Sequence, residues 1–289
     1  MSDDDIESSL DSEGEGIKQM KLYQHTDRVA RALKARSASA GVPITPEDFE
    51  HLDQLHYEGR EAVERAVDRL GVERGDDILD IGSGLGGPAR WLAHKVGCDV
   101  RALELQADLD SAARQLTSAC GLDEKVTHIC GDILDPACEP GPFDALVSWL
   151  VFLHIPNRSA LLAGCRERLK LGGGLYAEDF YLRSPLTAKE TKLLEEEVYC
   201  TSLVDEEQYV SELEASGFEA VQFEDRTEAW HRFVVDRQGS FVENRDQFVR
   251  TYNEATYSAL ASFYRTMVTL FSGGRLGGVV VSARAGPIG

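Results

Sequence analysis

Short apolar runs alternate with amphipathic segments through the middle of the chain. Apolar runs at 78–81, 99–105, 126–130, 143–150 and 175–179 predict β-strands, and the segments between them predict helices. This alternation is typical of a parallel sheet that helices cover on both faces. We therefore predict an α/β fold with a Rossmann-like, doubly wound, seven-stranded and mostly parallel sheet.

Helical segments flank this regular alternation. Apolar spacing predicts helices before the first strand and again after residue 180, where they surround two closing strands. The expected helices span 20–40, 45–57, 59–70, 187–199, 206–216 and 245–270, and the closing strands span 219–224 and 277–285. Extra helices at this end of an α/β domain usually form a lid over a substrate.

The length and composition favour one domain, because 289 residues, 43% of them hydrophobic, can bury one large core. Residues 1–16 are acidic and almost without apolar side chains, which predicts a disordered tail. The single predicted domain spans residues 17–289. Within it we expect a helical cover at 17–70, a cofactor-binding core at 76–180, and lid helices with closing strands at 181–289.

The net charge of −20 excludes some partners. A surface of this sign repels a phosphate backbone, so we expect no nucleic acid partner. No apolar run reaches the ~18 residues of a membrane span, and the first 18 residues resemble neither a secretory signal nor a transit peptide. The six cysteines match no zinc-site spacing, which predicts reduced thiols and no metal. We therefore expect a cytoplasmic monomer or homodimer that acts on a small molecule.

A glycine-rich turn follows the first predicted strand, in the stretch ILDIGSGLGGPARWLA at 78–93. Ligands of such sheets bind at the carboxyl ends of the strands. The glycines let a ligand approach the backbone, and the helix that starts near Pro88 offers free N–H groups there. Asp80 precedes the turn and would repel a phosphate, so the turn suits an amino-bearing ligand. The turn residues are Gly82, Ser83, Gly84 and Gly86.

Two further acids follow the next two strands. Glu104 ends the second strand at the spacing from the glycine turn that is typical of a ribose-binding acid. Asp132 follows the third strand and can accept a hydrogen bond from an exocyclic amine such as that of adenine. A ligand with an adenine, a ribose and a charged amino acid, but no phosphate, fits all three acids. The sequence therefore predicts S-adenosylmethionine as cofactor and S-adenosylhomocysteine as product.

These motifs resemble the class I S-adenosylmethionine-dependent methyltransferases. The resemblance rests on DIGSGLGG, ELQ, GD and the final glycine-rich strand, and it is best over residues 55–175. The stretches DQLHYEGREAVERA, FLHIPNR and EDF are similar to sarcosine/dimethylglycine N-methyltransferases. Phosphoethanolamine and tocopherol methyltransferases share much of the same pattern.

The resemblance implies further residues at the cofactor. The segment at 54–57 lies against the cofactor in the family, and Tyr23 belongs to a helix that can cover it. The other implied contacts flank the three acids or follow the fourth strand. Beside Asp80, Glu104, Asp132 and the turn residues, the expected cofactor contacts are Tyr23, Gln54, His56, Leu105, Gln106, Ile133 and Ser148.

The ends of strands four and five supply the candidate acceptor site. His154 or Tyr199 is expected to take the proton of an amine nucleophile. An aromatic cage of Trp149, Phe180 and Tyr199 would favour the growing ammonium charge. The other expected acceptor contacts are Glu178 and Asp179, which pair with a positive charge, and Arg183, which holds a carboxylate.

We therefore predict S-adenosylmethionine-dependent methylation of a small molecule, first of all N-methylation of sarcosine or dimethylglycine toward glycine betaine. A sulfur or oxygen acceptor is an alternative, for example a thioether acid, a phosphoethanolamine-like molecule or a natural product. The apolar stretch Trp149-Leu150-Val151 would suit a sulfur acceptor, where the family commonly has amide-rich residues. A cofactor-binding regulatory module without turnover is the alternative from another class.

Overall fold

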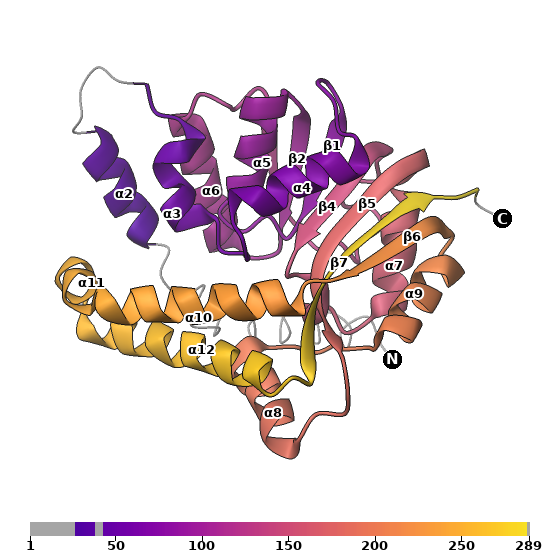
Figure 1. The fold of residues 1–289 in the computed structure, drawn as a ribbon. Coiled ribbons are helices and arrows are strands. Elements are labelled where there is room, and N and C mark those ends of the chain that lie inside the picture. Colours follow the sequence, from indigo (N-terminus) through magenta and orange to yellow (C-terminus); the bar gives the residue numbers. More distant parts are fainter. Residues whose placement is uncertain (1–26, 38–42, 288–289) are drawn as a thin grey trace, which may run out of the picture.

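A twisted seven-stranded sheet forms the centre of the part of the chain that the computed structural model describes, residues 27–37 and 43–287 (Figure 1). The strands are β1 Asp77–Ile81, β2 Asp99–Glu104, β3 Val126–Cys130, β4 Phe143–Trp149, β5 Leu169–Leu182, β6 Phe218–Asp225 and β7 Leu276–Ala285. Their order is β3-β2-β1-β4-β5-β7-β6. The first five strands pair in parallel, and β7 is antiparallel to β5 and β6. The predicted fold class is confirmed.

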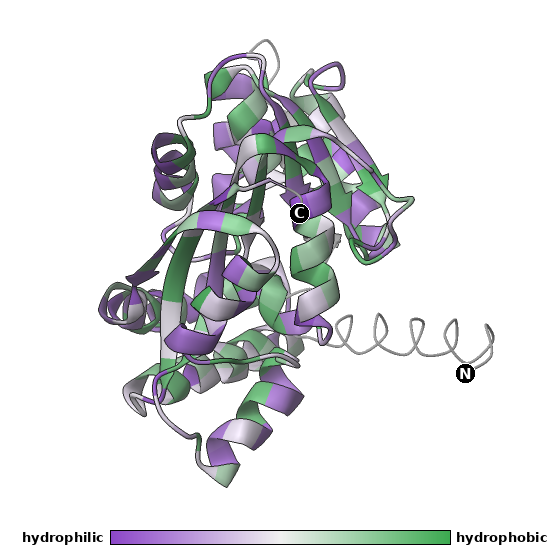
Figure 2. Cartoon of the chain, turned by 90° about the vertical axis from the view of Figure 1, so that its right-hand side faces the viewer, coloured by the Kyte–Doolittle hydropathy of each residue, from purple (hydrophilic) through white to green (hydrophobic). Residues whose placement is uncertain are grey.

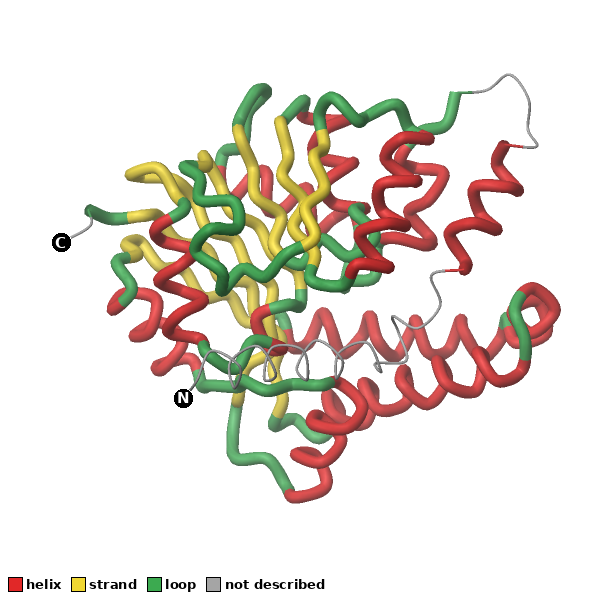
Figure 3. Tube along the Cα trace, turned by 180° about the vertical axis from the view of Figure 1, so that it is seen from behind, coloured by secondary structure: helices red, strands yellow, loops and turns green. Residues whose placement is uncertain are grey.

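Helices cover both faces of this sheet (Figure 3). Helices α4 and α5 pack on one face with the buried side chains of β1, β2 and β4, while α7 and α9 pack on the other. Helix α6 packs with α2 and α3 beside the β2–β3 edge (Figure 1). The bounds are α2 Asp27–Ser37, α3 Glu50–Asp53, α4 Arg60–Leu70, α5 Gly87–Trp91, α6 Ala107–Ala119, α7 Arg158–Glu167 and α9 Glu206–Ala215. Green and purple alternate along the helices in Figure 2, as expected for helices with one buried face.

A helical lid lies against the carboxyl ends of the parallel strands. Its two long helices, α10 Thr227–Glu243 and α12 Glu254–Ser272, run side by side (Figures 1 and 3). The shorter parts are α8 Ala188–Leu193, a π-turn at Leu194–Val198 and α11 Arg245–Thr251. The side chains between these helices form a separate apolar cluster that includes Trp230, Leu260 and Phe271.

Three local predictions differ from the structure. The helix expected at 45–57 is a 3₁₀ turn, Pro46–Phe49, followed by the short α3. The single helix expected at 245–270 is two helices, because the chain turns at Tyr252 and Asn253 caps α12. Helix α10 was not predicted. The predicted tail at 1–16, and Tyr23, lie outside the described residues, and the predicted division into cover, core and lid stays a prediction.

None of the six cysteines, all within the described residues, forms a disulfide. Among the helices of the described ranges, none has both the length and the apolar character needed to cross a bilayer. In the same ranges no group of three His, Cys, Asp or Glu side chains comes together as metal ligands would.

Candidate active site

Two adjoining cavities open at the carboxyl ends of β1, β2 and β4. The main cavity holds about 900 Å³ of empty space, its open mouth included, and reaches from Asp53 and Asp80 to the lid residues Phe263 and Met267. The side cavity holds about 650 Å³ and lies against Glu104 and Asp132. Four residues line both cavities: Gly82, Gly84, Val151 and His154. The predicted glycine turn therefore stands between the two compartments.

The glycine turn has the backbone conformation that glycine favours. Gly82, Gly84 and Gly86 have φ angles of +70°, +54° and +75°. The N–H groups of Gly82 and Ser83 both donate to the Leu103 carbonyl, at 2.8 and 2.9 Å, which ties the end of β1 to β2. Helix α5 starts directly after the turn. The turn is thus a fixed element of the cavity wall.

Glu104 stands at the end of β2 and faces the side cavity. One of its carboxylate oxygens accepts the N–H of Gly84 and the other accepts the N–H of Gln106, both at 2.9 Å. Each oxygen keeps a second acceptor position. Burial raises the pKa of Glu104 to about 7, against the effect of these two hydrogen bonds. Glu104 is oriented to accept hydrogen bonds from a pair of hydroxyl groups.

Three polar side chains at the inner end of the main cavity have atoms that form no hydrogen bond with any residue that the structure describes. These are Oδ2 of Asp80, Oδ1 of Asp53 and Oγ of Ser83. Burial and the nearby Glu104 carboxylate raise the pKa of Asp80 to about 8. A buried carboxylate without a donor is costly unless a ligand supplies one. This end of the cavity therefore suits a ligand that carries an ammonium group.

The side cavity has an apolar wall beside its acids. Leu105, Leu109 and Ile133 line it together with Gln106 and Asp132. One oxygen of Asp132 accepts the Leu134 N–H at 2.8 Å, and its other oxygen has no hydrogen bond to the described residues. Two apolar faces beside a hydrogen-bond acceptor fit a flat ring with an exocyclic amine.

His154 lies where the two cavities meet, in a short 3₁₀ turn after β4. Its Nδ1 is 2.9 Å from the Tyr199 carbonyl oxygen, which can only accept, so Nδ1 carries the proton. Burial lowers the pKa of His154. The ring is therefore neutral at pH 7, and Nε2 has a lone pair available in the site.

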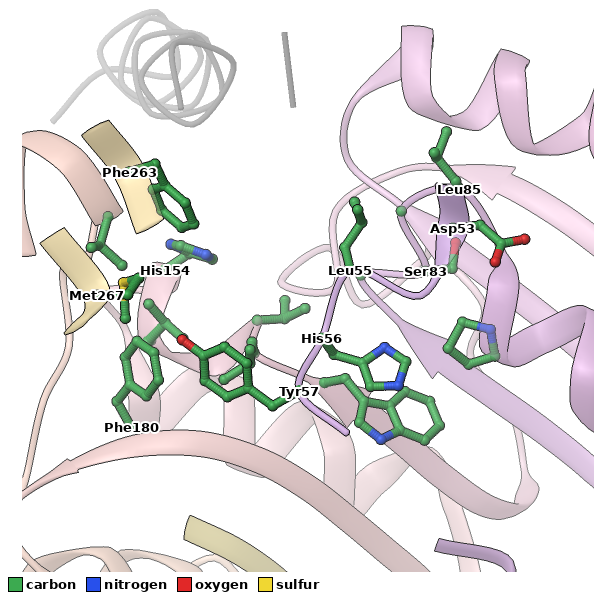
Figure 4. Close-up of a pocket in the computed structure, with 18 of the residues that line it drawn as sticks. Asp53, Leu55, His56, Tyr57, Ser83, Leu85, His154, Phe180, Phe263 and Met267 are labelled. Atoms are coloured by element: carbon green, nitrogen blue, oxygen red, sulfur yellow. The ribbon is translucent and has the colours of Figure 1, made fainter. Parts of the chain in front are cut away.

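The far side of the main cavity is mostly apolar. Figure 4 shows Tyr57 between the inner residues Asp53 and Ser83 and a group formed by His154, Phe180, Phe263 and Met267. The cavity wall adds Leu150, Leu153, Val198 and Val234. His56 and Trp149 also line the cavity, with ring centroids 5.5 Å apart, and burial lowers the pKa of His56 to about 4.

The two carboxylates predicted at the acceptor lie elsewhere. Glu178 is fully buried and accepts hydrogen bonds from Arg65 and Tyr176, at 2.9 and 2.7 Å. Asp179 is also fully buried and accepts a hydrogen bond from Tyr209 at 3.0 Å. Neither lines the two cavities. Both belong to ion-pair networks on the faces of the sheet.

Several other predicted contacts do not line the two cavities. Arg183 is exposed to solvent. Tyr199 contributes only its backbone carbonyl, which accepts the hydrogen bond from His154. Ser148 donates to the Ile81 carbonyl at 3.1 Å, and Gly86 packs on Arg90. Of the predicted residues, the lining contains Asp80, Gly82, Ser83, Gly84, Glu104, Leu105, Gln106, Asp132, Ile133, His56, Trp149, His154 and Phe180, whereas Gln54, Gly86, Ser148, Glu178, Asp179, Arg183 and the Tyr199 side chain lie outside it.

The lid wall was missed by sequence reasoning. Val234, Arg237, Phe263, Tyr264 and Met267 line the main cavity, and they come from α10 and α12. An apolar residue on such a helix looks the same in the sequence whether it faces the core or a cavity.

Comparisons with known proteins agree with this geometry. Residues 78–173 match the family model described as "Methyltransferase domain". The methyltransferase GfsG of Streptomyces halstedii is 26% identical over 71% of this chain and 74% of its own length. Sarcosine/dimethylglycine N-methyltransferase of Halorhodospira halochloris is 31% identical over 58% of this chain and 61% of its own length.

A solved structure has the same fold. Phosphoethanolamine N-methyltransferase 2 of Haemonchus contortus, in complex with S-adenosyl-L-methionine, superposes with a TM-score of 0.76 at 20% identity. The match covers 82% of this chain and 55% of that one. This chain thus spans less than two thirds of the length of these two N-methyltransferases.

The matched part of the chain, residues 78–173, is a methyltransferase domain, and the cofactor is S-adenosylmethionine. The cavities fit that cofactor. The unpartnered oxygens of Asp80 and Asp53 suit its ammonium group, and Glu104 suits its ribose hydroxyls. The apolar wall with Asp132 suits its adenine.

Proposed function

We propose that this methyltransferase transfers a methyl group to the nitrogen of a small amine that binds in the main cavity, with sarcosine and dimethylglycine as the first candidates. The observation that carries the proposal is the His154 ring, which is neutral and fixed by the Tyr199 carbonyl at the junction of the two cavities. When bound, S-adenosylmethionine supplies an activated methyl group on a sulfonium sulfur.

His154 acts as the proton acceptor. Most alkylamines are protonated at pH 7 and have no lone pair for a nucleophilic attack. The Nε2 lone pair of His154 takes the ammonium proton within the site, and the Tyr199 carbonyl stabilises the ring as it becomes positive. Tyr199 therefore takes part through its backbone as a positioning residue.

The aromatic side chains of the main cavity favour a methylated ammonium product. Tyr57, Phe180 and Phe263 line the cavity on the same side as His154 (Figure 4). Ring faces attract a quaternary ammonium, which holds its charge without donating hydrogen bonds. These rings replace the cage of Trp149, Phe180 and Tyr199 that the sequence predicts.

The relatives support an amine acceptor. One is named as acting on sarcosine and dimethylglycine, and the structural neighbour is named as acting on phosphoethanolamine. All three acceptors are small amines with an anionic group. The corresponding cellular proposal is glycine betaine formation in the cytoplasm by a monomer or homodimer.

A hydroxyl group on a larger apolar molecule is the second candidate. The observation that favours it is the apolar far wall of the main cavity, formed by residues such as Val198, Val234 and Met267. The same His154 lone pair would take the hydroxyl proton.

Product analysis separates the two candidates. Purified protein is given S-adenosylmethionine with a labelled methyl group and, in parallel, glycine, sarcosine, dimethylglycine, phosphoethanolamine and a panel of apolar alcohols. The proposal expects label in at least one amine, on nitrogen by mass spectrometry. Label only in an alcohol would replace the first candidate by the second.

A further inference from the structure

Arg237 of α10 is a positive charge in the wall of the main cavity. Its Nη1 and Nη2 donate to the carbonyl oxygens of Leu55 and His56, at 3.2 and 3.3 Å. The guanidinium carbon lies 4.5 Å from the centroid of the Phe233 ring. Within residues 27–37 and 43–287, no carboxylate oxygen lies within ion-pair distance of Arg237.

Two buried arginines of this chain pair with carboxylates, and a third donates to several backbone carbonyls. Arg90 pairs with Asp53 at 2.6 Å, and Arg158 pairs with Glu212 at 2.8 Å. Arg168 lacks a carboxylate, but its nitrogens donate to four backbone carbonyls. A guanidinium has five N–H donors, and Arg237 uses two of them in long hydrogen bonds.

Among the residues that the structure describes, none forms an ion pair with Arg237. Burial lowers the pKa of Arg237, yet a guanidinium stays charged in proteins. A desolvated cation without a counter-charge is costly, and an anion brought by a ligand removes that cost. A guanidinium also matches a carboxylate or a phosphate in a two-pronged geometry.

Arg237 is also accessible from outside. Together with Tyr264 it lines both the main cavity and an open groove on the lid, where Phe241 and Asn244 are neighbours. His154 lines the main cavity as well. A molecule in this cavity can therefore reach both Arg237 and the proton acceptor.

We propose that Arg237 binds an anionic group of the methyl acceptor, a carboxylate or a phosphate ester, and thereby orients the acceptor nitrogen toward His154. This inference rests on the proposed function and narrows it, because it requires an acceptor that carries both an amine and an anion. The sequence predicts the exposed Arg183 as the residue that binds the carboxylate. The inference assigns this contact to Arg237 on the lid instead.

Kinetics with matched acceptors test the inference. Arg237→Met removes the charge at similar size, and Arg237→Lys keeps a positive charge. For sarcosine, Arg237→Met is expected to raise KM by about 10- to 100-fold and also to lower kcat, because the bound nitrogen is no longer oriented toward His154. For sarcosine amide, which lacks the anion, KM should change less than about threefold. Arg237→Lys should recover part of the sarcosine affinity. An equal loss for acid and amide would overturn the inference.

Anion binding gives a readout that does not depend on turnover. Calorimetry with inorganic phosphate and with acetate is carried out on the wild type and on Arg237→Met, each saturated with S-adenosylhomocysteine. Anion binding that is present in the wild type and absent in Arg237→Met supports the inference. The anion that binds more tightly, phosphate or acetate, indicates whether the acceptor carries a phosphate ester or a carboxylate. No binding to the wild type, or equal binding to the variant, would overturn it. If Arg237 binds the anions but the wild type methylates no amine, the proposed function is wrong, while the anion-binding site at Arg237 is supported.

Discussion

Gly82→Ala is the sharpest perturbation of the cofactor site, because the structure leaves no room for a Cβ atom there. An added Cβ would lie 2.3 Å from Cγ2 and 2.7 Å from Cγ1 of Val151, whereas ordinary contacts start at 3.4 Å. Val151 lines both cavities, so it can move away only by filling them or by displacing the adjoining His154 turn. The φ of +70° adds backbone strain.

The expected cost has two parts. The left-handed backbone costs about 1–2 kcal/mol for alanine, and overpacking adds about 1–3 kcal/mol. We expect the unfolding free energy to fall by about 2–5 kcal/mol and Tm by roughly 4–10 °C. The affinity for S-adenosylmethionine should fall about 10- to 100-fold. A loss of this size corresponds to one charge-assisted hydrogen bond between the cofactor and Glu104.

Thermal unfolding and calorimetric cofactor titration measure both effects. Gly71→Ala is the matched control, since Gly71 has a φ of +66°, no atom within 4 Å of an added Cβ, and a position outside both cavities. It should lose only the backbone part of the stability and no cofactor affinity. Adding Val151→Ala to Gly82→Ala should restore part of both quantities. If Gly82→Ala behaved like Gly71→Ala, the reasoning about this turn would be refuted.

Two further predictions concern buried carboxylates. Because the pKa of Asp80 is raised to about 8, it is mostly protonated at pH 6, and binding a ligand ammonium releases the proton. Calorimetry should therefore find S-adenosylmethionine affinity rising between pH 6 and 7.5, and Asp80→Asn should flatten the rise; equal wild-type affinity at both pH values would contradict this. Glu178→Gln weakens a buried network with Arg65 and Tyr176, so we expect a lower Tm but an acceptor KM within about threefold of wild type. A KM increase of tenfold would return Glu178 to the acceptor site.

The cofactor half of the site could be predicted from the sequence because its signals are local. The glycine turn after Asp80 and the acids Glu104 and Asp132 each follow an apolar strand, and parallel strands end at one edge of the sheet. Residues that directly follow neighbouring parallel strands therefore lie close together in space. The structure confirms the sheet and brings these side chains to the same two cavities.

The acceptor half could not be predicted because its contacts are long-range. Glu178 lies within β5 rather than after it, and it is held outside the cavities by Arg65, which is 113 residues away in the sequence. Helix α10 was missed because only Thr227, Trp230 and Val234 are buried along it, which leaves a narrow apolar stripe. The lid wall exists only once α10 and α12 fold over the strand ends.

The most direct test of the central claim is the pH dependence of sarcosine methylation by wild type and His154→Ala. Wild-type kcat should be nearly constant between pH 7 and 9, because the neutral His154 removes the amine proton in the site. The His154→Ala rate should be low at pH 7 and rise about tenfold per pH unit, following the free base of an amine with a pKa of about 10. His94→Ala, an exposed histidine outside both cavities, should match the wild type. A His154→Ala profile parallel to the wild type would contradict the account.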